Sequence, residues 1–260
     1  MTTLAALVKK IETKMSYVEG GNFNMGSKKD ESEQPIHQVE ISSFYLSCYP
    51  TTNEQFVSFL NARDNQEEKG INWVNLEGNY SGVKCGIRKT ADGFECIKGL
   101  EKHPMIYVNW YGARAYCEWL SAQTGQAYRL PSESEWEYAA RGGRHQNDFS
   151  YAGSKDLNEV GWYKQNSHGQ TKPVGLKFSN ELGLYDMSGN VWEWCADHWH
   201  ENYKGAPKDG SAWLTGGDSS RRVVRGGSWN FFVNYCRVSF RYWNYADFRY
   251  ISIGFRVARY

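Results

Sequence analysis

The chain ends in an aromatic-rich stretch, residues 224–259, which reads VRGGSWNFFVNYCRVSFRYWNYADFRYISIGFRVAR. Between Trp229 and Phe255, 27 residues carry eleven aromatic rings, about a quarter of the rings in the 260-residue chain. A buried strand alternates apolar and polar residues or is apolar throughout, and this stretch follows neither pattern. We therefore expect some of its rings to be exposed and assign Trp229 and Phe255 to the core.

The same region is rich in arginine. Residues 221–260 contain eight Arg, no Lys and one Asp, a local charge of +7. Rings beside arginines can stack on single-stranded nucleic acid, but the whole chain has a net charge of only +1, too little to attract a polyanion. We therefore expect no nucleic acid as partner, and we expect Arg225, Arg237, Arg249 and Arg256 to tie irregular loops to carboxylates and backbone carbonyls.

Upstream of this stretch, the sequence indicates a mixture of short strands and a few helices. Short apolar segments broken by Gly and Asn between Met15 and Leu46 predict strands and turns. Capping residues mark the starts of three helices, at Thr51–Glu54, Asn109 and Ser132–Glu135. Gly125 ends the second helix and Gly142–Gly143 the third. We predict no helix beyond Gly143, and we interpret residues 64–103 and 200–220 as long loops.

Composition limits the remaining possibilities. No apolar run approaches the ~18 to 20 residues that cross a bilayer, so we expect no membrane insertion by the chain as given. Six cysteines without a Cys-x-x-Cys pair argue against zinc, and free thiols are the simplest interpretation of them. We predict an N-terminal tail or short helix at residues 1–14, a single domain at residues 15–260, a monomer and no cofactor.

Four blocks of sequence, taken together, carry a resemblance to a known family: Tyr17–Ser27, Tyr128–Gly143, Gly183–Asp197 and Val224–Arg259. Over residues 15–259 the chain resembles the formylglycine-generating enzyme-like family, also called the sulfatase-modifying factor domain. The resemblance implies an α+β fold, formylglycine-generating-enzyme-like and related to the C-type lectin fold, with little regular secondary structure.

The enzyme branches of that family depend on residues that this chain lacks. The oxidase branch has two redox-active cysteines in the last block, and here Phe231 stands at the first position and Cys236 at the second. A copper-bound thiolate pair needs two sulfurs. The iron-dependent sulfoxide synthases use a histidine triad, whereas His198 and His200 are the only close pair here. We expect no catalytic residues; the alternative is an oxidoreductase that uses Cys236 alone.

The last block resembles more closely the variable region of diversity-generating retroelement proteins, here about residues 225–256. That resemblance implies a non-enzymatic ligand-binding protein in which a constant frame supports diversified positions. The implied ligand-binding positions are Phe231, Phe232, Val233, Tyr235, Phe240, Tyr242, Trp243, Tyr245, Ala246, Phe248, Tyr250, Ile251 and Ser252. All except Trp243 can arise from an AAC asparagine codon by changes at adenine, the base that such elements rewrite.

The chemistry of this block is that of a protein-binding surface. Exposed aromatic residues give rigid, amphipathic contact area, as in antibody paratopes. Because each ring can bury ~150 to 250 Å², five rings suffice for the ~800 Å² per partner of an ordinary interface. We expect the partner to be a protein or another surface ligand, met at the cell surface or outside the cell by analogy with the retroelement proteins.

One segment raises the question of a structural metal site. Gly189–Glu193 resembles a segment that gives oxygen ligands to structural calcium in some family members, with Asn158 as a partner from another loop. In the alternative interpretation Asn190 caps a turn and Glu193 pairs with an arginine. We favour the alternative and predict no metal site.

Overall fold

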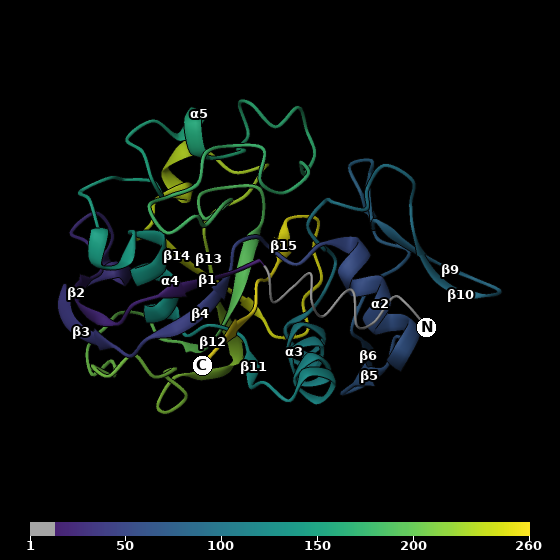
Figure 1. The fold of residues 1–260 in the computed structure, drawn as a ribbon, viewed down its shortest axis with the longest axis horizontal. Helices are drawn as coiled ribbons and strands as arrows, with labels where there is room; N and C mark the ends of the chain where they lie inside the picture. Colours follow the sequence, from purple (N-terminus) through teal and green to yellow (C-terminus); the bar gives the residue numbers. More distant parts are fainter. Residues whose placement is uncertain (1–13) are drawn as a thin grey trace.

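Two four-stranded sheets organise residues 14–260, the part of the chain that this computed structural model describes (Figure 1). The tail predicted at residues 1–14 lies, apart from Lys14, outside the described residues. The first sheet joins the two ends of the described chain. Its order is β1-β4-β16-β11, with β1 at Met15–Val18, β4 at Phe44–Ser47, β16 at Ala258–Arg259 and β11 at Tyr128–Arg129.

The second sheet holds most of the aromatic-rich stretch. Its order is β14-β13-β12-β15, with β14 at Arg241–Tyr245, β13 at Asp218–Arg225, β12 at Trp192–Trp199 and β15 at Ile253–Gly254. The β12–β13 and β13–β14 pairs are antiparallel, and β12–β15 is parallel. Strand β14 therefore lies at an edge of the sheet, where its side chains can reach solvent.

The three predicted helices are confirmed, and their caps explain where they start. They are α2 (Asn53–Arg63), α3 (Trp110–Thr124) and α4 (Glu133–Ala140). Gln55 Oε1 accepts the Thr52 N–H at 2.9 Å before α2, and Asn109 Oδ1 accepts the Gly112 N–H at 2.8 Å in α3. In α4, Ser132 Oγ accepts the Glu135 N–H at 3.1 Å while Glu135 accepts the Ser132 N–H. These bonds satisfy donors that a helix start leaves free.

The remaining elements are short. The predicted strands between Met15 and Leu46 are confirmed as β1, β4 and the hairpin of β2 (Gly21–Met25) and β3 (His37–Ile41). A one-turn helix, α5 (Leu157–Val160), corrects our prediction of no helix beyond Gly143, because four residues are too few to show a helical pattern. Single 3-10 turns are η1 (Glu31–Glu33), η2 (Gly143–His145) and η3 (Val233–Cys236).

The long loop predicted at residues 64–103 is instead built from three two-stranded hairpins. They are β5–β6 (Glu67–Glu68 and Ile71–Asn72), β7–β8 (Asn79–Tyr80 and Val83–Lys84) and β9–β10 (Ile87–Thr90 and Gly93–Cys96). The last of these projects from the body of the molecule at the right of Figure 1. Strands of two to four residues are too short for an alternating pattern, so the sequence did not reveal them.

The core lies beneath the aromatic-rich stretch as well as between the sheets and helices. Trp229 and Phe255 are buried, as predicted, and Phe255 packs edge-on against Phe56 and Tyr116. Gly227 adopts a φ of +72°, and a Cβ there would lie 2.7 Å from Cys236 Sγ. The Gly-Gly-Ser turn thus needs glycine both for its backbone angle and for its close approach to the next segment.

Candidate binding surface

The sequence-predicted binding residues come from three neighbouring segments: η3 with its flanks, the edge strand β14, and the loop that follows it. Four of their rings are exposed. Relative exposure is 52% for Phe232, 43% for Tyr242, 52% for Tyr245 and 39% for Phe248. A large ring left this open by a folded chain is apolar area available to a partner.

A group of packed rings surrounds Trp192 beneath part of the surface. Phe231, Phe240 and Tyr242 surround the buried Trp192, with ring centroids 5.4, 6.0 and 6.1 Å from it. Tyr235 joins the same group, 5.3 Å from Phe231 and 5.0 Å from Phe240, both edge-on. Aromatic pairs prefer such offset and edge-on contacts at these distances. The exposed ring of Tyr242 is therefore held on a packed aromatic base, so it loses little conformational freedom on binding.

A second aromatic group extends the surface. Phe248 stacks on Tyr250 at 5.4 Å, and Tyr250 contacts Tyr80 of the β7–β8 hairpin at 5.3 Å. Tyr80 is itself 54% exposed. Sequence reasoning missed both Tyr80, which lay in the supposed loop, and Trp192, which lay in a family block. An exposed tyrosine in an unpatterned polar segment carries no signal that separates it from an ordinary loop residue.

Cations border two of the rings. Lys164 Nζ lies 4.2 Å from the centroid of Phe232, and the Arg221 guanidinium lies 4.4 Å from that of Trp243. Trp243 and the β-branched Val233 are half-buried. Contacts of this kind hold a ring in one orientation, which again favours a preformed surface.

Three predicted binding residues are buried, which corrects the expectation that they are exposed: Ala246, Ile251 and Ser252 are each at most 2% accessible. Their backbones anchor the loop. Trp110 donates to Ala246 O at 3.0 Å, the Trp229 indole to Ile251 O at 3.0 Å, and Trp192 N–H to Ser252 O at 2.8 Å. Whether a residue can arise from an AAC codon says nothing about its burial in the fold. The codon pattern therefore could not separate these positions from the exposed ones.

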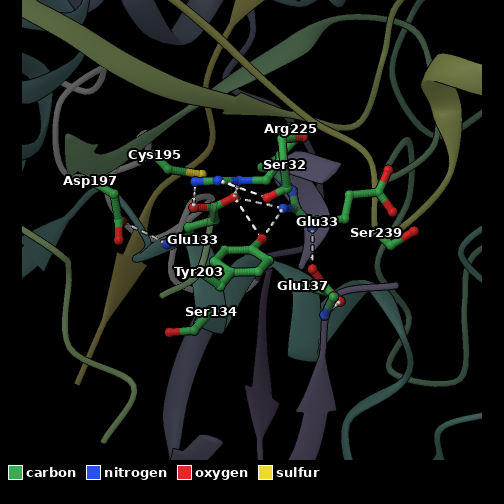
Figure 2. A network of polar contacts seen from close by, with 12 residues as sticks. Ser32, Glu33, Glu133, Ser134, Glu137, Cys195, Asp197, Tyr203, Arg225 and Ser239 are labelled. Carbon is green, nitrogen blue, oxygen red and sulfur yellow. Dashed lines mark hydrogen bonds and ion pairs between the residues drawn. The ribbon is translucent and has the colours of Figure 1, made fainter. Parts of the chain in front are cut away.

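Beneath the surface lies a buried network of arginines and carboxylates (Figure 2). Arg225 and Arg241 are directly paired across β13 and β14, where two like charges would repel. Glu133 of α4 accepts from both guanidinium groups at 2.7 Å. Glu137, one helical turn further along α4, accepts from Arg225 at 2.5 Å. The two carboxylates of helix α4 thus neutralise the paired arginines in the sheet that carries the exposed rings.

The other frame arginines behave as predicted. Arg237 forms a two-point pair with Glu33 of η1, at 2.6 and 3.0 Å, and Arg256 a similar pair with Glu193, at 2.7 Å twice. Arg249 donates to the Asn72 carbonyl at 3.1 Å. The local excess of positive charge is therefore largely matched by buried acids from elsewhere in the chain.

The network predicts a loss of stability in acid. Burial opposes ionisation of Glu137, but Arg141 and Arg225 outweigh it and lower its pKa to about 2 from 4.5. The unfolded chain then binds more protons than the folded one between these values, so the free energy of unfolding falls as the pH drops from 4.5 towards 2. At ~1.4 kcal/mol per pKa unit, this group alone accounts for roughly 3 kcal/mol.

Urea unfolding at pH 7, 4.5 and 3, followed by tryptophan fluorescence, measures this loss. Glu137→Gln removes the titrating group and should flatten the acid limb of the curve. Glu95→Gln, which breaks the exposed Arg88–Glu95 pair, should leave the limb as steep as in the wild type. A Glu137→Gln limb as steep as that of the wild type would contradict the assignment.

Cys236 lies sealed beneath the surface. It is fully buried under Gly227, and burial raises the pKa of its thiol to about 12 from 9.0. Phe231, at the place of the first oxidase cysteine, packs its ring on Trp192. All six cysteines are free thiols. A nucleophilic or metal-binding cysteine needs a thiolate that its reaction partner can reach. The Cys236 thiol is buried, and its raised pKa keeps it protonated at neutral pH.

The side chains weighed for calcium are engaged with protein groups. Asn190 bonds Lys172 through both amide atoms, at 3.1 Å each, and Glu193 pairs with Arg256 as predicted. Asn158 accepts the Tyr163 hydroxyl at 3.1 Å and donates to Asp156. Within residues 14–260, no group of three or more His, Cys, Asp or Glu side chains is placed to hold a metal ion.

Comparisons with known proteins identify several that are similar to this chain. The profile of the family described as "Sulfatase-modifying factor enzyme 1-like domain" matches residues 3–260. Serine/threonine-protein kinase pkn1 of Chlamydia caviae is 32% identical over 95% of this chain, and the chain spans only 38% of the length of that relative. The formylglycine-generating enzyme of Bos taurus is 31% identical, over 95% of this chain and 74% of that protein.

Two solved structures are similar over nearly the whole chain. PvdO from Pseudomonas aeruginosa is 32% identical with a TM-score of 0.76, covering 94% of this chain and 93% of that one. Treponema denticola variable protein 1 is 26% identical with a TM-score of 0.72, covering 94% of each chain.

None of the helices in residues 14–260 combines the length and apolar character needed to span a membrane.

Proposed function

Because this chain belongs to the sulfatase-modifying factor enzyme 1-like domain family, we propose that it is a member that binds ligands and catalyses no reaction, the variable protein of a diversity-generating retroelement. Its α+β fold is the formylglycine-generating-enzyme-like, C-type-lectin-like fold predicted from the sequence. Membership alone leaves the activity open, since one fold carries many functions. The function is therefore inferred from the residues of the binding surface.

The observation that carries the proposal is the set of four exposed rings, Phe232, Tyr242, Tyr245 and Phe248, contributed by neighbouring segments of the aromatic-rich stretch. Such a surface suits recognition by shape and apolar burial, with the tyrosine hydroxyls adding polar contacts. The buried arginine–carboxylate pairs beneath it involve none of these four rings, as a diversified surface requires. The likeness to Treponema denticola variable protein 1 supports the same interpretation.

We further propose that the partner is a protein or another surface ligand, bound by a monomer at the cell surface or outside the cell. A nucleic-acid partner is disfavoured, because Arg225, Arg237, Arg241 and Arg256 are buried in pairs with carboxylates and cannot reach phosphates. In a diversified site, selection for one particular ligand determines which residues are present. The ligand therefore has to be identified by experiment.

The DNA next to the coding sequence tests the retroelement assignment directly. We expect a near-copy of the segment encoding residues 225–256, differing almost only at adenines and adjacent to a reverse transcriptase gene. Differences at the codons of the exposed rings, with identity at the codons of Arg225, Trp229 and Arg256, would support the proposal. Absence of such a copy would overturn the retroelement part of it.

The second candidate is an oxidoreductase of the parent family, which the family match and the formylglycine-generating enzyme relatives favour. It would have to use Cys236. We expect that the native protein fails to oxidise a cysteine-containing sulfatase peptide with or without copper, because the thiol is buried and its pKa is about 12.

Mass spectrometry after iodoacetamide treatment at pH 8 checks the premise. Cys236 should remain unmodified in the native chain and react only in denaturant, whereas the partly exposed Cys48 provides an internal comparison. Copper-dependent turnover of the peptide that is lost in Cys236→Ser would establish the oxidoreductase and refute the non-enzymatic assignment.

A further inference from the structure

A cavity of about 450 Å³ lies between helix α3 and the strand pair β12–β13, apart from the aromatic surface. Its wall is largely apolar and includes Trp110, Cys117, Leu130 and Ala196. Leu214, which also lines it, is 51% exposed, so the cavity opens to solvent. Its volume lies within the ~300 to 1,000 Å³ range of small-molecule sites. The proposed function assigns no role to this cavity.

Arg222 brings a cation with unused donors to the cavity. Its guanidinium carbon lies over Trp110, 3.9 Å from the ring centroid, and the side chain donates through Nη1 to Ala196 O at 2.9 Å. That is the only hydrogen bond of the side chain within residues 14–260, and its buried Nε has no acceptor there. Among the described residues Nη2 also has no acceptor, so it is free to donate to a ligand.

The two other arginines of the cavity wall show what Arg222 lacks. Arg114 pairs with Glu68 and Glu118 at 2.9 and 3.2 Å, and Arg129 forms a two-point pair with Glu135. Across residues 14–260, no carboxylate lies within the 4.0 Å ion-pair distance of Arg222. A partly desolvated guanidinium without a counter-charge favours an incoming anion, and bonds to a carboxylate are among the stronger ones in proteins.

We propose that this cavity binds a small aromatic carboxylate. Its flat apolar body would lie in the cavity beside Trp110 and Leu130, and its carboxylate would accept hydrogen bonds from Arg222. The apolar wall supplies contact area, while the single unpaired guanidinium fixes orientation and charge. The preference for a carboxylate over an uncharged head follows from the missing counter-charge.

Isothermal titration of the full chain with sodium 2-naphthoate tests the site. We expect saturable binding with one molecule per chain, and at least tenfold weaker binding of the uncharged 2-naphthamide. Arg222→Gln should weaken naphthoate binding at least tenfold, and Ala196→Leu, which fills the cavity, should abolish it. Arg221→Gln is the matched control, because this neighbouring arginine pairs with Asp218 at 2.5 Å and faces Trp243 instead.

The outcomes separate this site from the aromatic surface. Binding that survives both Arg222→Gln and Ala196→Leu, or equal binding of acid and amide, would overturn the proposal. Binding that is lost in Tyr245→Ala but retained in Arg222→Gln would place the probe on the aromatic surface and would also overturn it. If Ala196→Leu fails to fold by circular dichroism, Arg222→Gln against Arg221→Gln decides alone.

Discussion

Replacing Arg225 by methionine should lower the free energy of unfolding by about 3 to 5 kcal/mol, the usual effect of removing one partner from a buried ion pair. Arg225 is fully buried, and Glu137 approaches it at 2.5 Å and Glu133 at 2.7 Å. Without it, Glu137 keeps only Arg141 and Glu133 only Arg241 as cationic partners. The substitution also leaves the Val238 carbonyl without its donor.

Urea unfolding at pH 7, monitored by fluorescence and circular dichroism, measures the effect. Arg88→Met is the matched control, because it removes an arginine from an exposed pair with Glu95 and should change stability by no more than ~1 kcal/mol. Equal effects of Arg225→Met and Arg88→Met would show that the buried network does not support the sheet.

The arginine frame shows how far sequence reasoning reaches. Because the resemblance places Arg225, Arg237 and Arg256 in a constant frame, we predict that they tie irregular loops to carboxylates and backbone carbonyls. Their partners could not be predicted, because Glu33, Glu133 and Glu193 lie 204, 92 and 63 residues from the arginines they bind. Pairing over such separations is decided by tertiary packing.

The surface itself was only partly predictable. The irregular aromatic pattern indicated that some rings are exposed, and four of them are. The pattern could not show that Ala246, Ile251 and Ser252 turn inward, because their burial follows from backbone bonds to tryptophan donors in other segments. Nor could it bring in Tyr80, whose two-residue strand is positioned by the Tyr107 hydroxyl that accepts its N–H at 2.9 Å.

Truncating the exposed tyrosines should separate binding from folding. We expect Tyr242→Ala and Tyr245→Ala each to weaken the affinity for a ligand isolated with the wild-type chain by ~30-fold or more, which corresponds to ~2 kcal/mol. Each ring is about half exposed and rests on neighbours that stay in place, Trp192 for Tyr242 and Trp243 for Tyr245. The unfolding midpoint in urea should therefore move little.

Tyr17→Ala provides the control for this second prediction, because Tyr17 is 53% exposed, close to the 52% of Tyr245, but lies on β1 of the other sheet. It should leave both affinity and stability unchanged, since surface truncations away from a contact have small effects.

Phe240→Ala tests the packed rings beneath the surface. It removes a ring that packs on Trp192 and Tyr235, so both stability and affinity should fall. If Tyr245→Ala behaved like Phe240→Ala in unfolding, its ring would be part of the core and could not be a contact for a partner. If it instead matched Tyr17→Ala in every measurement, the ligand would bind elsewhere on the molecule.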